Sequence, residues 1–374
     1  MNAPDSPPAA TQRGPTNLGR AELLLRRLFL TSLVLLTGLV STSAALTVRE
    51  AFKQPAAWFA SAEGSQFIGN VVSHQSPVGS WPKNENTGAS AYSGDPAKLK
   101  GTFDNGATTG ELRLLAKASQ ATGNATYSNA VVRGIDHILG AQYTNGGWPQ
   151  FSPPPAKTYH RHITFNDDAM RRLLEFLREV AGPQEAASNL FAFIDPPRRA
   201  KAAAAFAKGI DCILKCQVRV DGKLTVWCAQ HDEITLEPRP ARAFELTSLS
   251  GAESAGLLIF LMRFEQPSPE VVKAVHAGAA WFETSKLTGI REVKVDGDKK
   301  IVRDPAAPSL WARFYEIDTN RPFYCGRDGI KRFDISEIEA ERRNGYAWHG
   351  AWGSELTKRY ADWKSHWPAP SPNP

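Results

Sequence analysis

A short motif that recurs after helical stretches constrains the fold of this chain more than any other feature. The sequence Gly-Ser-Trp-Pro at residues 79–82 returns as Gly-Gly-Trp-Pro at residues 146–149, an offset of 67 residues, and Trp227 and Trp311 follow helix pairs in comparable places. A fixed spacing of this kind indicates supersecondary units that each bury one face against the next. We therefore expect helix pairs that form an incomplete (α/α) toroid, with the inter-helix loops collected at one end. An irregular helical domain with coincidental tryptophans is the alternative.

Apolar residues spaced three and four apart predict the helices themselves. The expected helices cover Thr108–Ala121, Ala125–Gln142, a segment that begins after Asn166, Ala202–Gln217, Glu253–Phe264 and Pro269–Thr284. Strand signals are few and short, at Lys223–Cys228 and at Val293–Val302 around an Asp-Gly turn. The predicted fold class is all-α, with short β-strands in the loops.

The first 45 residues differ in character from the rest of the chain. Arg20, Arg26 and Arg27 precede an apolar run at residues 28–40, and small residues follow up to Ala45. This order is typical of a secretory signal peptide, and the apolar run is shorter than the ~20 residues that cross a bilayer. We predict a disordered N-terminus and signal peptide at residues 1–45, one domain at residues 46–374, and a secreted or periplasmic protein that leaves the membrane after cleavage. An uncleaved anchor is the alternative.

The charge balance of the chain is mild. It has 44 basic and 38 acidic residues and a net charge of +6. Four arginines and two acidic residues lie before residue 46, so a net charge of about +4 remains for the predicted domain. This balance suits a polyanionic substrate, and because no compact Lys/Arg tract is present outside the loops, we expect no nucleic-acid partner.

Acidic and amide side chains stand directly before two of the predicted helices. Asp104 and Asn105 precede one helix, and Asn166, Asp167 and Asp168 precede another. Asp and Asn are common helix caps, because they accept hydrogen bonds from the first backbone N–H groups. The same oxygen atoms also suit Ca²⁺, which takes ~6–8 oxygen ligands. If the fold brings the two junctions together, they form a shared calcium site with positions open for a substrate carboxylate.

The loop at residues 227–251 combines His, Asp, Glu and Arg side chains. His231 and its two acidic neighbours resemble part of a zinc site, but no second His stands at ligand spacing, so we do not expect zinc. Arg239 and Arg242 flank a proline that stiffens the backbone. Either arginine can serve in a site, or it can be bonded to a buried carboxylate such as Glu245. Two more arginines follow at residues 313 and 327, with the planar fork that grips carboxylates.

Together these segments resemble the pectate lyases of polysaccharide lyase family ten. The resemblance spans roughly residues 74–348 and rests on the order of FDNGAT, GGWPQF, HITFNDDAM, WCAQHD, EPRPARAFE, SLSGAESAG, WARFYE and CGRDG. It implies a monomeric, calcium-dependent lyase on an (α/α) toroid. Its substrate would be (1→4)-α-D-galacturonan (polygalacturonate, or pectate), cleaved by β-elimination to 4,5-unsaturated oligogalacturonides. Residues 46–374 would then be the catalytic domain.

The resemblance also implies roles for individual residues. One Asp-Asn pair and a later Asp bind calcium in the family, and these correspond to Asp104, Asn105 and Asp167. Because Asp168 stands beside Asp167, either of these two residues can be the third calcium ligand. The uronate carboxylates would be held by basic residues of the cleft, namely His74, Arg313 and Arg327.

An arginine in an A-R-A-aromatic-Glu segment is the base of the family, which corresponds to Arg242, with Arg239 as the alternative. Arginine has a reference pKa of about 12.5–13.8, so action near pH 10 requires a fall of roughly 3 units, or about 4 kcal/mol. Burial, calcium and neighbouring arginines all favour the neutral guanidine. We therefore expect an alkaline pH optimum.

Two other classes of function fit the same residues. A glycoside hydrolase on a similar toroid would use two carboxylates about 5–10 Å apart, such as Asp104 with Asp167 or Glu245. A non-catalytic carbohydrate-binding protein would use calcium and the arginines only to grip uronates.

Overall fold

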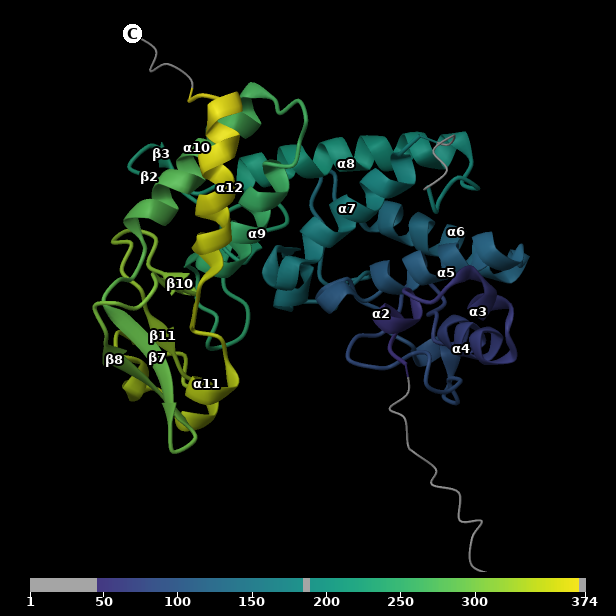
Figure 1. The fold of residues 1–374 in the computed structure, drawn as a ribbon, viewed down its shortest axis with the longest axis horizontal. Helices are drawn as coiled ribbons and strands as arrows, with labels where there is room; N and C mark the ends of the chain where they lie inside the picture. Colours follow the sequence, from purple (N-terminus) through teal and green to yellow (C-terminus); the bar gives the residue numbers. More distant parts are fainter. Residues whose placement is uncertain (1–45, 184–188, 370–374) are drawn as a thin grey trace, which may run out of the picture. The chain divides into compact units, whose positions relative to one another are not determined.

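Helices provide most of the regular structure in the computed structural model, which describes residues 46–183 and 189–369 (Figure 1). The predicted signal peptide lies outside these residues. The α-helices are α2 (Val48–Ala51), α3 (Ala56–Ala60), α4 (Ala62–Ser73), α5 (Thr109–Thr122), α6 (Ala125–Ala141), α7 (Ala169–Ala181), α8 (Pro196–Cys216), α9 (Gly251–Leu261), α10 (Pro269–Thr284), α11 (Ala340–Gly345) and α12 (Trp352–His366). The 3₁₀ helices are η1 (Pro96–Lys98), η2 (Asp104–Gly106), η3 (Tyr159–Arg161), η4 (Asn166–Asp168) and η5 (Ile335–Glu337). None of the helices in the described ranges combines the length and the apolar character needed to cross a bilayer.

The observed helices follow the predicted ones closely. Helix α10 has the predicted bounds, α5 is shifted by one residue at each end, and α6 ends one residue earlier than predicted. Helix α8 begins at Pro196 rather than at Ala202, because the Asp195 carboxylate caps it by accepting a hydrogen bond from the backbone N–H of Arg198. Proline in the first turn is compatible with this start, since its missing N–H would be unpaired there anyway.

The four tryptophans make the same hydrogen bond in four successive units. Each indole Nε1 donates to a backbone carbonyl in the last or next-to-last turn of the helix before it, and all four side chains are buried. The pairs are Trp81 with Val71 (2.7 Å), Trp148 with Ile138 (2.8 Å), Trp227 with Ile213 (2.7 Å) and Trp311 with Phe282 (2.9 Å). The sequence motif therefore marks a structural repeat, in which the tryptophan anchors the loop that follows the helix.

Glutamines link each unit to the next. Gln75, after α4, donates from Nε2 to the Ala130 carbonyl of α6 at 2.8 Å. Gln142, after α6, donates to Ala205 of α8 at 2.8 Å, and Gln217, after α8, donates to Ala274 of α10 at 3.0 Å. Helices α4, α6, α8 and α10 are thus joined in series.

Consecutive helices also pack in pairs, α5 with α6, α7 with α8 and α9 with α10, and α7 contacts both α5 and α9. Figure 1 shows α5 to α8 lying side by side. This arrangement has two series of helices, α4-α6-α8-α10 and α5-α7-α9, as a toroid of helix pairs requires. Closure of the series into an incomplete (α/α) toroid stays a prediction.

The strands are short and lie in the loops. They are β1 (Ile163–Thr164), β2 (Arg219–Val220), β3 (Lys223–Leu224), β4 (Gln230–His231), β5 (Pro238–Arg239), β6 (Leu249–Ser250), β7 (Ile290–Val295), β8 (Asp298–Arg303), β9 (Trp311–Ala312), β10 (Phe314–Tyr315), β11 (Tyr324–Cys325), β12 (Lys331–Arg332) and β13 (His349–Gly350). Strands β7 and β8 form the predicted hairpin, in which Asp296 (φ 51°) and Gly297 (φ 81°) make the turn.

Two of the small sheets position the loops that matter below. In the antiparallel sheet β1-β4-β5, Ile163 lies opposite His231 and Gln230 lies opposite Arg239. In the pair β10-β6, Phe314 lies opposite Ser250. These registers tie residues 163–164, just before η4, to the 227–251 loop, and that loop to residues 311–315. The four cysteines, at positions 212, 216, 228 and 325, are buried free thiols.

Candidate active site

Two turns that precede neighbouring helices bring the predicted calcium ligands to one place. Turn η2 (Asp104–Gly106) leads into α5, η4 (Asn166–Asp168) leads towards α7, and the two turns pack against each other. Asn105 and Asp167 have equivalent left-handed backbones, with φ of 53° and 51°. Asn and Asp tolerate this conformation better than most residues, which explains their presence at the centre of each turn.

Asp104 is buried, with 1% of its surface exposed. Its Oδ2 accepts hydrogen bonds from Nζ of Lys83 and from Nε2 of Gln150, the latter at 2.7 Å. Its Oδ1 is buried and has no hydrogen-bond partner among the described residues. A buried carboxylate oxygen without a partner is costly, so it indicates a missing ligand.

Arg313 joins the second turn to the start of α9. Its Nη2 donates to Oε1 of Glu253 at 2.7 Å and to Oδ1 of Asn166 at 3.3 Å, and lies 3.8 Å from Oδ1 of Asp167. Burial alone would lower the pKa of Arg313, but the surrounding negative charges, chiefly Glu253, raise it instead. Arg313 is therefore a fixed cation in a nearly buried position, and its Nε has no hydrogen-bond partner among the described residues.

The oxygen atoms of this site fit a hard divalent cation. Burial raises the pKa of Asp167, and the carboxylates of Glu253 and Asp104 raise it further. The three acidic groups are thus close enough to repel one another, and one oxygen of Asp104 is unpaired. Carboxylate and amide oxygens are the ligands that Ca²⁺ prefers, so Asp104, Asp167 and the neighbouring Asn105 are suited to hold it. Their role as metal ligands stays a prediction.

Asp168 is less suited to be the third ligand. Its two carboxylate oxygens accept a bidentate pair from Arg171, at 3.0 and 2.7 Å. Among the described residues, the side chain of Asp167 has one hydrogen-bond donor, Nδ2 of Asn166 at 2.8 Å. The geometry therefore favours Asp167 over its neighbour.

Arg242 is bonded to Glu245, the buried carboxylate that the sequence analysis considered as a structural partner for it. Its Nε donates to Oε2 of Glu245 at 2.7 Å and its Nη2 donates to Oε1 at 2.5 Å. Glu245 also accepts from the hydroxyl of Tyr346 at 2.8 Å, and the Tyr346 ring lies 4.7 Å below the Arg313 guanidinium. The hydrogen bonds to Glu245 raise the pKa of Arg242. This shift is opposite to the one expected from burial and neighbouring arginines.

The three predicted substrate-binding residues lie in different surroundings. Arg313 lies among Asp104, Asp167 and Glu253, the cluster that we call the carboxylate site. Arg327 is exposed and bound to Glu341 at 2.9 and 3.0 Å, but its guanidinium lies 5.7 Å from the Phe244 ring, over which Arg242 also lies at 4.7 Å. His74 is buried at the end of α4, where Nδ1 bonds to the Asn70 carbonyl at 2.9 Å. Within the described ranges no hydrogen bond or ion pair joins His74 to Asp104, Asp167 or Glu253.

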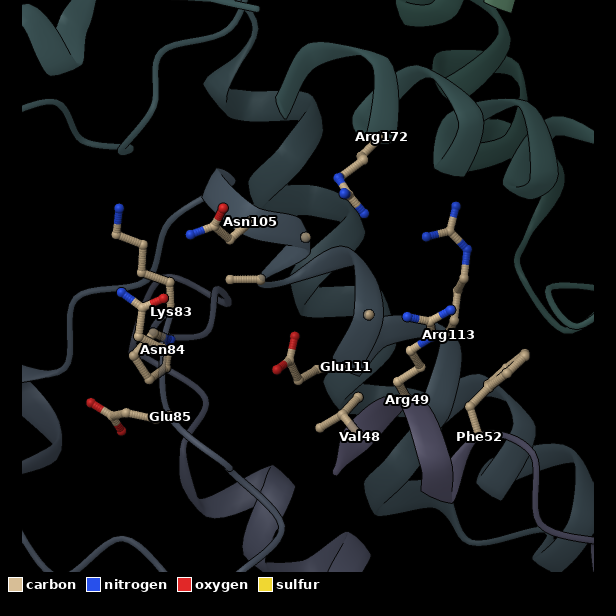
Figure 2. Close-up of a pocket in the computed structure, with 14 residues that line it drawn as sticks. Val48, Arg49, Phe52, Lys83, Asn84, Glu85, Asn105, Glu111, Arg113 and Arg172 are labelled. Atoms are coloured by element: carbon tan, nitrogen blue, oxygen red, sulfur yellow. The ribbon is translucent and has the colours of Figure 1, made fainter. Parts of the chain in front are cut away.

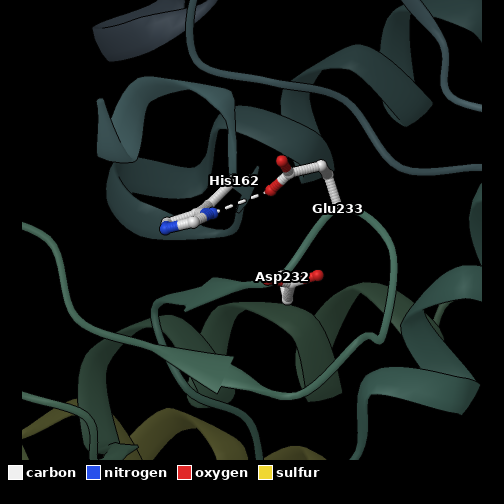
Figure 3. Close-up of side chains that lie close together, drawn as sticks. All are labelled: His162, Asp232 and Glu233. Atoms are coloured by element: carbon white, nitrogen blue, oxygen red, sulfur yellow. Dashed lines mark hydrogen bonds and ion pairs between the residues drawn. The ribbon is translucent and has the colours of Figure 1, made fainter. Parts of the chain in front are cut away.

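Arg239, the alternative base, is bound to another acidic group. Its Nε donates to Oδ2 of Asp232 at 2.9 Å. Asp232 belongs with His162 and Glu233 to the one trio of His, Cys, Asp or Glu side chains in the described residues whose ligand atoms lie within 4.8 Å of one another (Figure 3).

The trio that contains Asp232 is already neutralised. Nδ1 of His162 bonds to Glu233 at 2.9 Å, and Arg161 makes an ion pair with the same carboxylate. Burial alone would raise the pKa of Asp232, but backbone N–H groups and Arg239 lower it to about 2. The His involved is His162 rather than His231, which is fully buried and bonded to the Leu236 carbonyl at 2.8 Å.

Sequence reasoning missed four residues of the carboxylate site. Lys83 and Gln150 both bond to Asp104, and each directly follows one copy of the Trp-Pro repeat. Glu253 lies within the SLSGAESAG segment, and Tyr346 near the end of the resemblance. The equivalent positions of Lys83 and Gln150 after the Trp-Pro repeat could therefore have predicted that both residues belong to one site.

A pocket of about 480 Å³ opens beside η2 (Figure 2). Lys83 and Asn105 line it together with residues of α2, α5 and α7. It therefore adjoins the carboxylate site.

Comparisons with known proteins define the class. The solved structure of a family 10 polysaccharide lyase from Cellvibrio cellulosa superposes with a TM-score of 0.73 and 37% identity over 82% of this chain and 96% of that one. An Asp→Ala variant of a family 10 polysaccharide lyase from the same organism was solved in complex with trigalacturonic acid. It superposes with a TM-score of 0.72 and 35% identity over 86% of this chain and 99% of that one. Among curated proteins, none matches the sequence.

The likeness to these structures makes the protein a polysaccharide lyase, as the sequence motifs predicted. The family model of the pectic acid lyases matches residues 75–357. The chain belongs to the pectic acid lyase family.

Proposed function

We propose that this protein is a calcium-dependent pectate lyase that cleaves (1→4)-α-D-galacturonan by β-elimination and releases 4,5-unsaturated oligogalacturonides. Membership of the pectic acid lyase family and the trigalacturonic acid complex of a related lyase support this substrate. The observation that carries the calcium dependence is the meeting of η2 and η4, where Asp104 presents a buried, unpaired oxygen next to Asp167.

The difficult step is removal of the weakly acidic proton on C5 of a galacturonate residue. As the C5–H bond breaks, a C4=C5 double bond forms, the C4–O4 bond breaks, and the departing O4 oxygen takes a proton from solvent. A calcium ion held by Asp104, Asn105 and Asp167 would supply electrostatic stabilisation for the charge that develops on the adjacent carboxylate. Arg313 adds a fixed positive charge next to Glu253 and Asp167.

Arg242 is our candidate for the base. While Glu245 holds it, Arg242 is a cation and cannot accept a proton. Action as a base therefore requires that the pair separates when substrate binds and that the pKa falls by about 3 units, or ~4 kcal/mol. Nearby positive charges, including Arg327, push in that direction. An alkaline pH optimum follows from this requirement.

We also propose the incomplete (α/α) toroid and export from the cytoplasm. The serial links between α4, α6, α8 and α10 support the first proposal. The basic, apolar and small-residue order before residue 46 supports the second.

An absorbance assay tests the activity. The protein is incubated with polygalacturonate, first with calcium and then with a chelator, and the ultraviolet absorbance of the conjugated double bond is followed. We expect absorbance that requires calcium. Reducing ends without this absorbance would indicate a hydrolase, and a protein that only binds the polymer would give neither signal.

A further inference from the structure

Arg172 makes no ion pair with any residue that the structure describes. It is half-buried on α7, and its Nε is buried without a hydrogen bond to any described residue. The preceding residue, Arg171, is by contrast bonded to Asp168 and Glu175. Leaving a buried donor unpaired is costly, so such a group usually has a ligand.

The Arg172 guanidinium lies against the turn that carries Asn105. A Cβ atom added at Gly106 would stand 3.2 Å from Nη1 of Arg172. Gly106 (φ 79°) therefore serves both the left-handed turn and the close approach of the guanidinium. Figure 2 shows Arg172 pointing into the pocket beside η2, on the same side as Asn105.

A buried carboxyl group also lines this pocket. Glu111, on α5, is 6% exposed, and its Oε2 has no hydrogen-bond partner among the described residues. Burial raises the pKa of Glu111 to about 7, so near neutral pH part of the population can donate a hydrogen bond and the rest can accept one. A hydroxyl group is a suitable partner for both forms.

The other charges of the pocket leave room for an anion. The pocket is lined by Arg49, Lys83, Arg113 and Arg172 against Glu85 and Glu111. Lys83 is engaged by Asp104, and Arg113 is bonded to Glu179 at 2.7 and 2.9 Å. The available cationic groups are thus Arg172 and the exposed Arg49. A volume of about 480 Å³ lies within the range of ligand pockets.

We propose that this pocket is a distal subsite, which binds a uronate residue of the polymer beyond the two residues at the cleaved bond. Arg172 holds its carboxylate, and Glu111 bonds to a ring hydroxyl. Because Lys83 and Asn105 line both the pocket and the carboxylate site, a polymer chain can run from one to the other. The inference rests on the proposed function, since it takes the substrate to be a polyuronate.

The test compares Arg172→Ala with Arg178→Ala on substrates of different length. Arg178 is an exposed arginine of the same helix, lies over the Phe260 ring and does not line the pocket. For Arg172→Ala we expect kcat/KM on long oligogalacturonides to fall about tenfold, mainly through KM, because one charge-assisted contact is lost. On the shortest oligogalacturonide that the wild type cleaves, kcat/KM should stay unchanged. Arg178→Ala should resemble the wild type on both.

Two controls test whether Arg172→Ala acts by disturbing the fold. They are the thermal unfolding midpoint of this variant and the activity of a variant that retains the charge. Arg172→Ala should not lower the thermal unfolding midpoint, because it removes a half-buried cation that lacks a counter-ion. Arg172→Lys should give an intermediate loss on long substrates, since it retains the charge but not the planar fork. An equal loss on short and long substrates, no loss on either, or a lowered midpoint would overturn the proposal.

If the wild type proved inactive on polygalacturonate, the proposed function would fail while the subsite could still be judged. Calorimetric titration with hexagalacturonate in the presence of a chelator would then decide. Weaker binding by Arg172→Ala than by Arg178→Ala would support the subsite, and equal binding would overturn it.

Discussion

Replacing Glu245 by glutamine tests whether Arg242 is the base. The change keeps the size of the side chain and removes its negative charge. Arg242 donates two charge-assisted hydrogen bonds to Glu245, at 2.7 and 2.5 Å, and these raise its pKa. In Glu245→Gln the neutral guanidine should therefore form at lower pH.

The size of the effect can be worked from the geometry. Hydrogen bonds to charged groups contribute about 1.5–3 kcal/mol each. The Arg242 side chain is 44% exposed, so solvent screens the pair and we take about 1.5–3 kcal/mol for both bonds together. At 1.36 kcal/mol per pKa unit, this corresponds to a fall of about 1–2 units.

The assay is the pH dependence of kcat/KM, which reports the free enzyme in which Arg242 and Glu245 are paired, followed by absorbance with saturating calcium. If Arg242 is the base, the rising limb of the profile should move to lower pH by about 1–2 units in Glu245→Gln. Glu179→Gln is a matched control, because Glu179 makes a similar bidentate pair with Arg113 away from the carboxylate site. A lower rate with an unmoved limb would refute the assignment and would leave Glu245 as a residue that only positions Arg242.

Three further predictions concern the metal, the scaffold and pH. Asp104→Ala should raise the calcium concentration needed for half-maximal activity about tenfold or more, with partial recovery at high calcium; an unchanged calcium titration would contradict the proposed site. Trp148→Ala should lower the free energy of unfolding by about 3–5 kcal/mol in urea, because it removes a buried side chain and its bond to Ile138; a loss below about 1 kcal/mol would show that the anchor matters little. His231 is buried, which lowers its pKa from 6.5 to about 4. The fold therefore has its full free energy of unfolding above pH 6.5, where His231 is neutral in both the folded and the unfolded state. As the pH falls towards 4, the unfolded state gains a proton and up to ~3 kcal/mol of this free energy should be lost. Urea unfolding of wild type and His231→Gln at several pH values checks this, and parallel curves would contradict it.

Sequence reasoning succeeded where local pattern determines structure. Helices α5, α6 and α10 follow from apolar spacing, and the hairpin β7-β8 follows from Asp296-Gly297. The two turns proposed to hold calcium could also be located, because Asp and Asn before a helix are visible in any single sequence. Their meeting in space depends on how α5 packs against α7, which no local pattern contains.

Side-chain pairing was the part that the sequence left open. Arg242, Arg239 and Arg327 were all available as charged residues of the cleft, yet each is bound to a different acidic side chain. His162 and Glu233 lie 71 residues apart and meet only because β1 pairs with β4. His74 was assigned to substrate through the family resemblance, and the sequence could not show that its ring is buried and bonded to the Asn70 carbonyl.

In each Trp-Pro repeat, the tryptophan contributes to stability, whereas the residue after the proline contacts the site. The tryptophan fixes the backbone there, while the next side chain, Lys83 in one unit and Gln150 in another, reaches the same carboxylate oxygen. Exchange of Lys83 alters the charge next to Asp104, exchange of Gln150 alters its hydrogen bonding, and both leave the buried indoles in place. At the proposed calcium site, the charge and the hydrogen bonding around Asp104 can thus be altered while the tryptophan anchors are kept.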